Sequence, residues 1–194
     1  MTAALYPAFL KLEGLPVVVV GGGTVAASKL DGLLAAGAHV TVVAPHVVPS
    51  IRERVAVTVA VTVIEQAFRP EHLSGARWVV AAAPPAVNRE VATAAAARGL
   101  FVNAVDDPSV ATAYLGGVVR RGPVEIAIST GGLAPALAGL LREALEAILP
   151  DDLDKWIEIA KSERAAWKQA RVPMPERRPL LLRALERLYS RGAA

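Results

Sequence analysis

The stretch VVVVGGGTVAASK at residues 17–29 constrains the fold more strongly than any other part of the sequence. Its valines predict a buried strand, its glycines a tight turn, and the small residues after them the start of a helix. Within the turn, Gly21, Gly23 and Ala26 match the pattern G-x-G-x-x-A. This pattern lets the backbone approach a pyrophosphate and presents the amides of a helix N-terminus to it. The stretch therefore predicts the opening strand, turn and helix of a nucleotide-binding domain.

The alternation of strand and helix patterns continues to about residue 105. Short β-branched runs such as HVTVVAP, ARWVVAAA and LFVNAVD alternate with alanine-rich segments, which implies crossover connections and a parallel sheet. Gly37 and Gly99 stand where helix C-caps are expected. The valine-rich residues 55–68 are predicted to be extended, and VTVIEQ within them to form a further strand. We therefore predict an α/β fold with an N-terminal Rossmann-type parallel sheet over residues 1–113.

The pattern changes after Asp107-Pro108, and residues 114–149 predict a hairpin followed by a helix. The strands of the hairpin flank RRGP, and the helix places a series of apolar residues on one side. These are Leu137, Leu140, Leu141, Ala144, Leu145 and Ile148. A hairpin with one helix is too small to fold alone, so it should pack on the first domain or on another subunit.

Residues 150–194 predict a small helical domain with two or more helices. Asp151 or Asp152 can cap the first helix, and VPMPERRP predicts a break before the last one. The chain is thus divided into residues 1–113, 114–149 and 150–194.

Composition and charge exclude several classes of function. The chain has 194 residues, 54% of them hydrophobic, and no cysteine, which excludes disulfides, thiolate metal sites and a cysteine nucleophile. Neither a secretion signal nor a membrane span is recognisable, so the cytoplasm is the expected compartment. The net charge is +3, but aromatic residues make up only 5% and do not alternate with basic ones. We therefore expect no nucleic-acid partner, whereas an anionic small molecule fits the surplus of positive charge.

Two adjacent aspartates, Asp106 and Asp107, follow the strand pattern of LFVNAV. Ligands of open parallel sheets bind at the carboxyl ends of the strands, so one of these acids is expected to face the cofactor and take a proton from a substrate. Because adjacent strand residues point to opposite sides, the other should cap a turn. A role for both as turn residues is equally open. Asn103 is expected to be buried and to satisfy the backbone, and the alternative is that it orients a ligand.

The end of the second strand does not decide between NAD and NADP. An acid that holds the ribose hydroxyls is expected about 20 residues after the glycine turn. The sequence has Ala44-Pro45-His46 at this place, without an arginine for a 2′-phosphate. The predicted dinucleotide contacts lie in the loops after the first, second and fourth strands. They are Gly21, Gly22, Gly23, Thr24, Val25, Ala44, Pro45, Ala82 and Ala83.

Taken together, these motifs resemble the siroheme-biosynthesis proteins that act as precorrin-2 dehydrogenase and, in some members, also as sirohydrochlorin ferrochelatase. The matching stretches are YPAFLKLEGLPVVVVGGGTVAASK, VTVVAP, VNAVDDP, ISTGG, PAL and LLREALE, in the order of the family and over nearly the whole first 150 residues. The tail resembles the family only in being helical. The resemblance implies NAD as cofactor and the oxidation of precorrin-2, a tetrapyrrole, to sirohydrochlorin.

The resemblance also implies roles for individual residues. The essential aspartate of the family falls on Asp106, which makes it the general base rather than Asp107. Arg120, Arg121 and Arg142 are candidates to meet substrate carboxylates, although a surface role is the alternative for each of them. Thr130 replaces a serine found near the active site in some members, and its alternative role is that of a helix N-cap. Members are homodimers, and the central segment, here about residues 114–149, interlocks the subunits.

Several departures from the family fall in the central segment. Ala134 and Gly139 replace a serine and an arginine, and YLGG at residues 114–117 replaces F-x-x-P. The three histidines are scattered and predict no dedicated metal site, so Fe²⁺ or Co²⁺ enters only as a substrate of chelation, which the sequence leaves open. Two alternative functions also remain. In the first, the chain is a dimeric module that senses a dinucleotide without catalysis, and in the second it is an oxidoreductase for another anionic substrate.

Overall fold

A computed structural model describes residues 4–190 of the chain. The chain divides into two compact units. The first unit runs to Leu115 and includes Gly131–Ala134, and the second comprises Gly116–Thr130 and the residues from Pro135 onward. None of the helices in the described part is long and apolar enough to cross a membrane.

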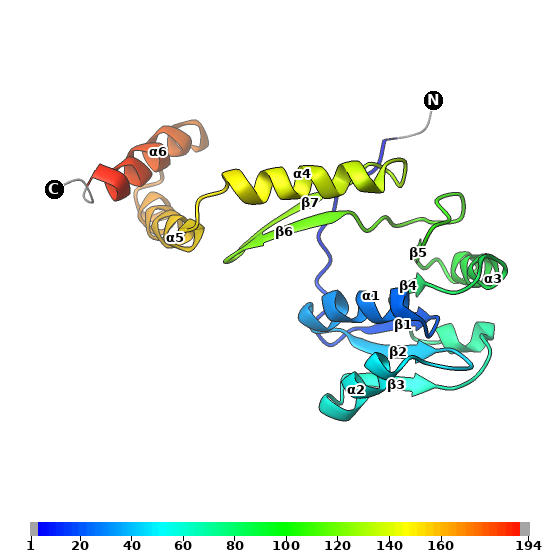
Figure 1. Ribbon diagram of the computed structural model, residues 1–194. Coiled ribbons are helices and arrows are strands. Elements are labelled where there is room, and N and C mark those ends of the chain that lie inside the picture. Colours follow the sequence, from blue (N-terminus) through cyan, green and yellow to red (C-terminus); the bar gives the residue numbers. More distant parts are fainter. Residues whose placement is uncertain (1–3, 191–194) are drawn as a thin grey trace. The chain divides into compact units, whose positions relative to one another are not determined.

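The first unit confirms the predicted α/β fold (Figure 1). Its described part contains a parallel five-stranded sheet in the order β3-β2-β1-β4-β5. The strands are β1 (Pro16–Val20), β2 (His39–Val43), β3 (Val61–Ile64), β4 (Trp78–Ala81) and β5 (Val102–Ala104). They are joined through α1 (Thr24–Ala35), α2 (Pro49–Val57), the short 3₁₀ helix η1 (Pro70–Leu73) and α3 (Pro85–Ala96).

The valines of β1 explain why this strand lies at the centre of the sheet. Val17 and Val19 face a core cluster with α1 and α2, whereas Val18 and Val20 face a second cluster with η1 and α3. This is the alternation that a strand imposes on successive side chains. Full burial of a valine side chain contributes about 1.5–3 kcal/mol. An unbroken valine run is therefore suited to a strand that helices cover on both faces.

The register of the sheet brings all five strand ends to one edge. Val20 is paired with Val43 on one side and with Ala81 on the other. Val43 is in turn paired with Ile64, and Ala81 with Ala104. Because these five residues are the last of their strands, the loops that follow them share the carboxyl edge of the sheet. The predicted cofactor and catalytic residues of the first unit lie in these loops and in the first turn of α1.

The predicted extended conformation of residues 55–68 is wrong for its first part, because α2 continues to Val57. Helix α2 begins with a proline at N1 or N2, a residue whose fixed φ suits a helix start. It buries Ile51 completely, and the Arg54 side chain donates to the carbonyl oxygen of Ser50 at 2.7 Å. Ile51 thus anchors α2 on the sheet, and the exposed Val55 and Val57 continue the helix in spite of their β preference. The expected strand within VTVIEQ is present as β3.

The second unit contains the predicted hairpin and helix. Strands β6 (Gly117–Arg121) and β7 (Val124–Ile128) pair in antiparallel fashion, and α4 (Pro135–Ile148) packs on them. A Cβ atom at Gly117 would lie 2.9 Å from the Ala138 carbonyl oxygen, so a glycine permits the close approach of helix and hairpin. Ala138 is buried there.

Two further helices, α5 (Leu153–Gln169) and α6 (Met174–Ser190), pack on each other. The indole of Trp156 donates to the Tyr189 hydroxyl at 2.6 Å. The predicted break at VPMPERRP is wrong in its extent, because α6 already begins at Met174 and contains Pro179. The guanidinium of Arg177 donates twice to the carbonyl oxygen of Val172, at 2.9 and 3.0 Å, and fixes this early start.

Candidate functional site

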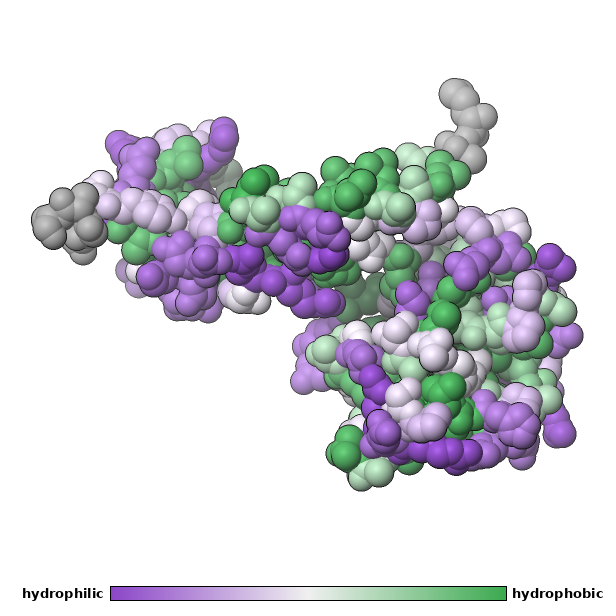
Figure 2. Space-filling model, in the orientation of Figure 1, coloured by the Kyte–Doolittle hydropathy of each residue, from purple (hydrophilic) through white to green (hydrophobic). Residues whose placement is uncertain are grey.

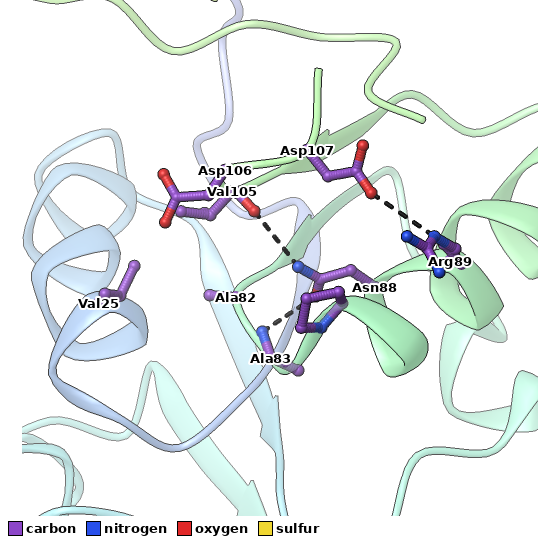
Figure 3. Close-up of a pocket in the computed structure, with 9 residues that line it drawn as sticks. Val25, Ala82, Ala83, Asn88, Arg89, Val105, Asp106 and Asp107 are labelled. Carbon is purple, nitrogen blue, oxygen red and sulfur yellow. Dashed lines mark hydrogen bonds and ion pairs between the residues drawn. The ribbon is translucent and has the colours of Figure 1, made fainter. Parts of the chain in front are cut away.

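A pocket of about 430 Å³ lies in the first unit at the carboxyl edge of the sheet (Figure 3). Its walls come from the first turn of α1, the loop after β4, the start of α3 and the loop after β5. The lining residues are Val25, Ala82, Ala83, Pro85, Asn88, Arg89, Val105, Asp106 and Asp107. The pocket therefore brings together four of the predicted site residues. These are Val25, Ala82, Ala83 and Asp106.

The three glycines of the turn after β1 have different surroundings. Gly21 has a φ of +130°, and a Cβ atom there would lie 2.1 Å from the Ala82 carbonyl oxygen. A Cβ atom at Gly22 would lie 1.9 Å from the carbonyl oxygen of His46. At Gly23, by contrast, no atom of the chain lies within 4 Å of such a Cβ atom. Packing thus requires the first two glycines, whereas the third leaves open space beside the backbone.

The same turn forms the N-terminus of α1, with Gly23 as the N-cap. A glycine has no side chain to accept hydrogen bonds from the first-turn amides, and no side-chain cap is present. These amides carry the positive end of the helix dipole and suit an anion. Ala26 is fully buried, so α1 packs closely on the sheet. Open space at Gly23 beside uncapped amides fits the pyrophosphate of a dinucleotide.

Asp106 has an unusual backbone conformation, with a φ of +59°. Aspartate is among the few residues other than glycine that tolerate this left-handed region. Strand β5 ends at Ala104, so the alternation of strand side chains does not reach the two aspartates. Both Asp106 and Asp107 line the pocket, so strand alternation is not what separates their roles.

The two carboxylates nevertheless differ in their contacts. Asp107 lies 3.8 Å from the Nε atom of Arg89 and accepts a short hydrogen bond from the Ser109 hydroxyl, so it holds a turn. Figure 3 shows the two side chains pointing apart, with Asp107 turned toward Arg89. Asp106 is exposed, and among the described residues its carboxylate has no hydrogen bond or ion pair. Asp106 is consequently the carboxylate that is available to a ligand.

Asn88 is a site residue that sequence reasoning missed. Its side chain is buried, with 2% exposure, and its Oδ1 atom accepts a hydrogen bond from the Ala83 amide at 3.0 Å. Its Nδ2 atom donates to the Val105 carbonyl oxygen at 3.3 Å. One side chain thus joins the loop after β4 to the loop that carries Asp106. The signal in the sequence is an asparagine among the alanines and valines of a helix.

Asn103 confirms the expectation of a buried asparagine that satisfies the backbone. It is 7% exposed, and its Nδ2 atom donates to the Ala113 carbonyl oxygen at 3.0 Å. Its partner therefore lies in the loop after β5, outside the residues that line the pocket.

The remaining predicted site residues lie elsewhere. Ala44 is buried and Pro45 exposed directly after β2. Arg120 and Arg121 belong to β6, and Thr130 follows β7 in the second unit. The guanidinium of Arg120 is 2.8 Å from Glu125, and that of Arg121 pairs with Asp151.

Arg142 of α4 pairs with Glu143 at 3.2 Å and with Glu146 at 2.6 Å. The arginines considered for substrate carboxylates are thus all in ion pairs within the second unit. Among residues 4–190, no group of three or more histidine, aspartate or glutamate side chains is placed to hold a metal ion.

Comparisons with known proteins point in one direction. A family model described as "Putative NAD(P)-binding" matches residues 8–117, and a model described as "Sirohaem biosynthesis protein central" matches residues 121–148. Siroheme synthase 1 of Pectobacterium atrosepticum is 44% identical over 187 residues, which are 94% of this chain and 37% of the relative. Siroheme synthase 2 of Aeromonas salmonicida is 41% identical over 179 residues, or 92% of this chain and 37% of the relative.

The chain therefore spans little more than a third of the length of these relatives. A solved structure described as "SirC, precorrin-2 dehydrogenase" is similar over most of both chains. It has a TM-score of 0.71 and 28% sequence identity, and the match covers 92% of this chain and 88% of that one.

Proposed function

This chain belongs to the NAD(P)-binding family of siroheme biosynthesis, and from that premise we propose that it is a dehydrogenase that oxidises precorrin-2 to sirohydrochlorin with NAD. The observation that carries this proposal is a single pocket that joins the first turn of α1 to Asp106. A nicotinamide dinucleotide, when bound, accepts the hydride in such a reaction. The solved structure of similar fold is described as a precorrin-2 dehydrogenase, which supports the choice of substrate.

The dinucleotide is held, in this proposal, by the turn after β1. The amides of Thr24 and Val25 at the start of α1 donate to the pyrophosphate, and Gly23 leaves the space for it. Ala82 and Ala83 after β4 line the same pocket and would contact the bound dinucleotide. Ala44 and Pro45 after β2 lie on the side of the adenosine ribose, as the position after the second strand implies.

Asp106 takes up the proton that the substrate loses as its hydride departs. Oxidation of precorrin-2 removes two electrons and two protons in total, of which the hydride carries both electrons and one proton. The second proton needs a base within hydrogen-bonding reach. Asp107 is engaged by Arg89 and Ser109, whereas the exposed carboxylate of Asp106 lines the pocket. This division of contacts supports Asp106 as the base.

The second unit contributes the subunit contact in this proposal. The helix α4 exposes an apolar side, with exposed fractions of 49% for Leu137, 64% for Leu140, 43% for Leu141 and 74% for Ile148. Figure 2 shows hydrophobic surface along this helix. Exposed apolar patches of this kind mark association surfaces. We therefore propose a homodimer in which the central segment, about residues 114–149, joins the subunits.

The same segment carries the proposed contacts to the substrate, whose carboxylates need cations. Arg120, Arg121 and Thr130 are the proposed partners. The Arg120 side chain is 55% exposed, so a substrate carboxylate can reach its guanidinium. The absence of cysteine from the sequence suits the cytoplasm, which is the proposed compartment.

The proposal is tested by incubating the purified chain with precorrin-2 and NAD. We expect sirohydrochlorin and NADH to appear in equal amounts. Binding of the dinucleotide without turnover would instead favour a sensing module, and turnover of a different anion would contradict the choice of substrate. Addition of Fe²⁺ or Co²⁺ to the completed reaction tests chelation, for which the metal ion would be a second substrate.

A further inference from the structure

We propose that Glu65 takes the place of the acid that is missing after β2 and that Glu65 and Arg52 together make the chain prefer NAD to NADP. The inference rests on the proposed function, because it concerns the adenosine end of the same dinucleotide site. Four observations support it: the register of β2 and β3, the packing of the loop after β2, the ion pairs of α2 and the charge of Glu65.

The register places Glu65 next to the residue at which a ribose-binding acid is expected. Val43 and Ile64 are paired at the ends of β2 and β3, and the Ala44 amide donates to the Ile64 carbonyl oxygen at 3.2 Å. Ala44 and Glu65 are therefore the first residues beyond the ends of two adjacent strands. Ala44 has no group that can bind a hydroxyl, whereas the carboxylate of Glu65 can accept hydrogen bonds from one.

The loop after β2 packs directly on the glycine turn. A Cβ atom at Gly22 would lie only 1.9 Å from the His46 carbonyl oxygen and would clash with it. The amide of Val48 donates to the Gly22 carbonyl oxygen at 2.8 Å. Helix α2 starts with the next residue, Pro49, and carries Arg52 in its first turn. The helix that holds Arg52 thus begins directly beside the turn that is proposed to bind the pyrophosphate, and Glu65 follows the strand next to this loop.

Arg52 and Glu65 form a direct ion pair at the surface. The Nη1 atom of Arg52 lies 2.7 Å from Oε1 of Glu65, and the two side chains are 57% and 44% exposed. The hydrogen bond from Arg52 and the positive charge of its guanidinium lower the pKa of the Glu65 carboxyl. The same pair raises the pKa of Arg52. Both groups are consequently charged at neutral pH.

This pair discriminates between the two dinucleotides for a chemical reason. A guanidinium is the group that best binds the 2′-phosphate of NADP, and Glu65 occupies the guanidinium of Arg52. The other arginine of α2, Arg54, pairs instead with Asp31 of α1, at 2.8 Å through both Nε and Nη2, and takes no part in this discrimination. A carboxylate at this place repels a 2′-phosphate, but it accepts a hydrogen bond from the 2′-hydroxyl of NAD.

The test is a binding titration of the full chain with NADH and, separately, with NADPH. Wild type is expected to bind NADH more tightly. Glu65→Gln should shift the ratio of the NADPH to the NADH affinity by about tenfold or more toward NADPH, which corresponds to the loss of one charge contact. Arg52→Gln should further weaken NADPH binding, and the double variant should lose the gain made by Glu65→Gln.

Asp31→Asn is the matched control, because it removes the same charge and releases Arg54 instead of Arg52. This variant should leave the ratio unchanged. The inference is overturned if wild type prefers NADPH, if Glu65→Gln leaves the ratio where it is, or if Asp31→Asn shifts it equally. In each of these cases a dinucleotide still binds and the proposed oxidation stands, but a preference for NADPH would make NADP rather than NAD its cofactor. If wild type binds neither NADH nor NADPH, the proposed function itself fails.

Discussion

The side chain of Asn88 donates a hydrogen bond to the carbonyl oxygen of Val105, so helix α3 is tied to the residue that directly precedes Asp106. The Oδ1 atom of the same side chain accepts a hydrogen bond from the amide of Ala83, which also lines the pocket. Asp106 has a φ of +59°, a conformation that persists only when the surroundings hold it. Asn88 is therefore a positioning residue for the proposed base rather than a group that touches the substrate.

Replacement of Asn88 by alanine should reduce both stability and turnover. It leaves the Ala83 amide and the Val105 carbonyl without partners, which costs about 1–3 kcal/mol in the free energy of unfolding. We expect kcat to fall more strongly than the affinity for NADH. Asn103→Ala is the control, because Asn103 is also buried but bonds to Ala113 outside the pocket. Equal losses of kcat in the two variants, measured beside denaturant unfolding, would show that Asn88 acts on stability alone.

Alanine substitutions in the turn after β1 should affect stability at Gly21 and cofactor binding at Gly23. Gly21→Ala places a Cβ atom against the Ala82 carbonyl oxygen at a φ of +130°, and such strain costs about 1–3 kcal/mol even before the clash is counted. Gly23→Ala meets no atom of the chain within 4 Å, so its stability should stay within about 0.5 kcal/mol of wild type.

Calorimetric titration with NADH provides the second half of this comparison. Gly23→Ala should bind NADH more weakly, because its methyl group enters the space proposed for the pyrophosphate. A Gly23→Ala variant that melts and binds NADH like wild type would mean that the dinucleotide does not approach this residue.

The apolar side of α4 should determine the oligomeric state. Leu140→Glu places a charge in the proposed interface, where burial of the leucine would contribute about 1.5–3 kcal/mol per subunit. Light scattering after gel filtration is expected to show a dimer for wild type and a monomer for the variant. Val57→Glu is the control, since Val57 is 82% exposed on α2 of the first unit. A monomeric wild type, or an equal effect of both variants, would contradict the proposed interface.

The parts of the fold that the sequence predicted depend on local chemistry. The valine run of β1 needs burial on both faces, which only a central strand provides. The left-handed conformations of Gly37 and Gly99, with φ of +76° and +65°, follow from the preference for glycine after a helix. The hairpin turn between β6 and β7 likewise contains the expected Gly122, with a φ of +55°.

What the sequence did not predict depends on contacts between distant segments. The hydrogen bonds of Asn88 join α3 to two loops, and no spacing rule links residue 88 to residue 105. Residues 55–57 continue a helix that Ile51 anchors on the sheet, although valine by itself favours a strand. The assumption of strand alternation at Asp106 and Asp107 failed because β5 is short and ends at Ala104.

Turnover of precorrin-2 by an Asp106→Asn variant, measured together with NADH binding, tests the proposed role of the pocket most directly. The amide has the shape of the carboxylate but cannot take up a proton, so kcat should fall by about 10²-fold or more. The dissociation constant of NADH should remain that of wild type, and Asp107→Asn should lose less activity. An Asp106→Asn variant that produces sirohydrochlorin at the wild-type rate would contradict the assignment of Asp106 as the base.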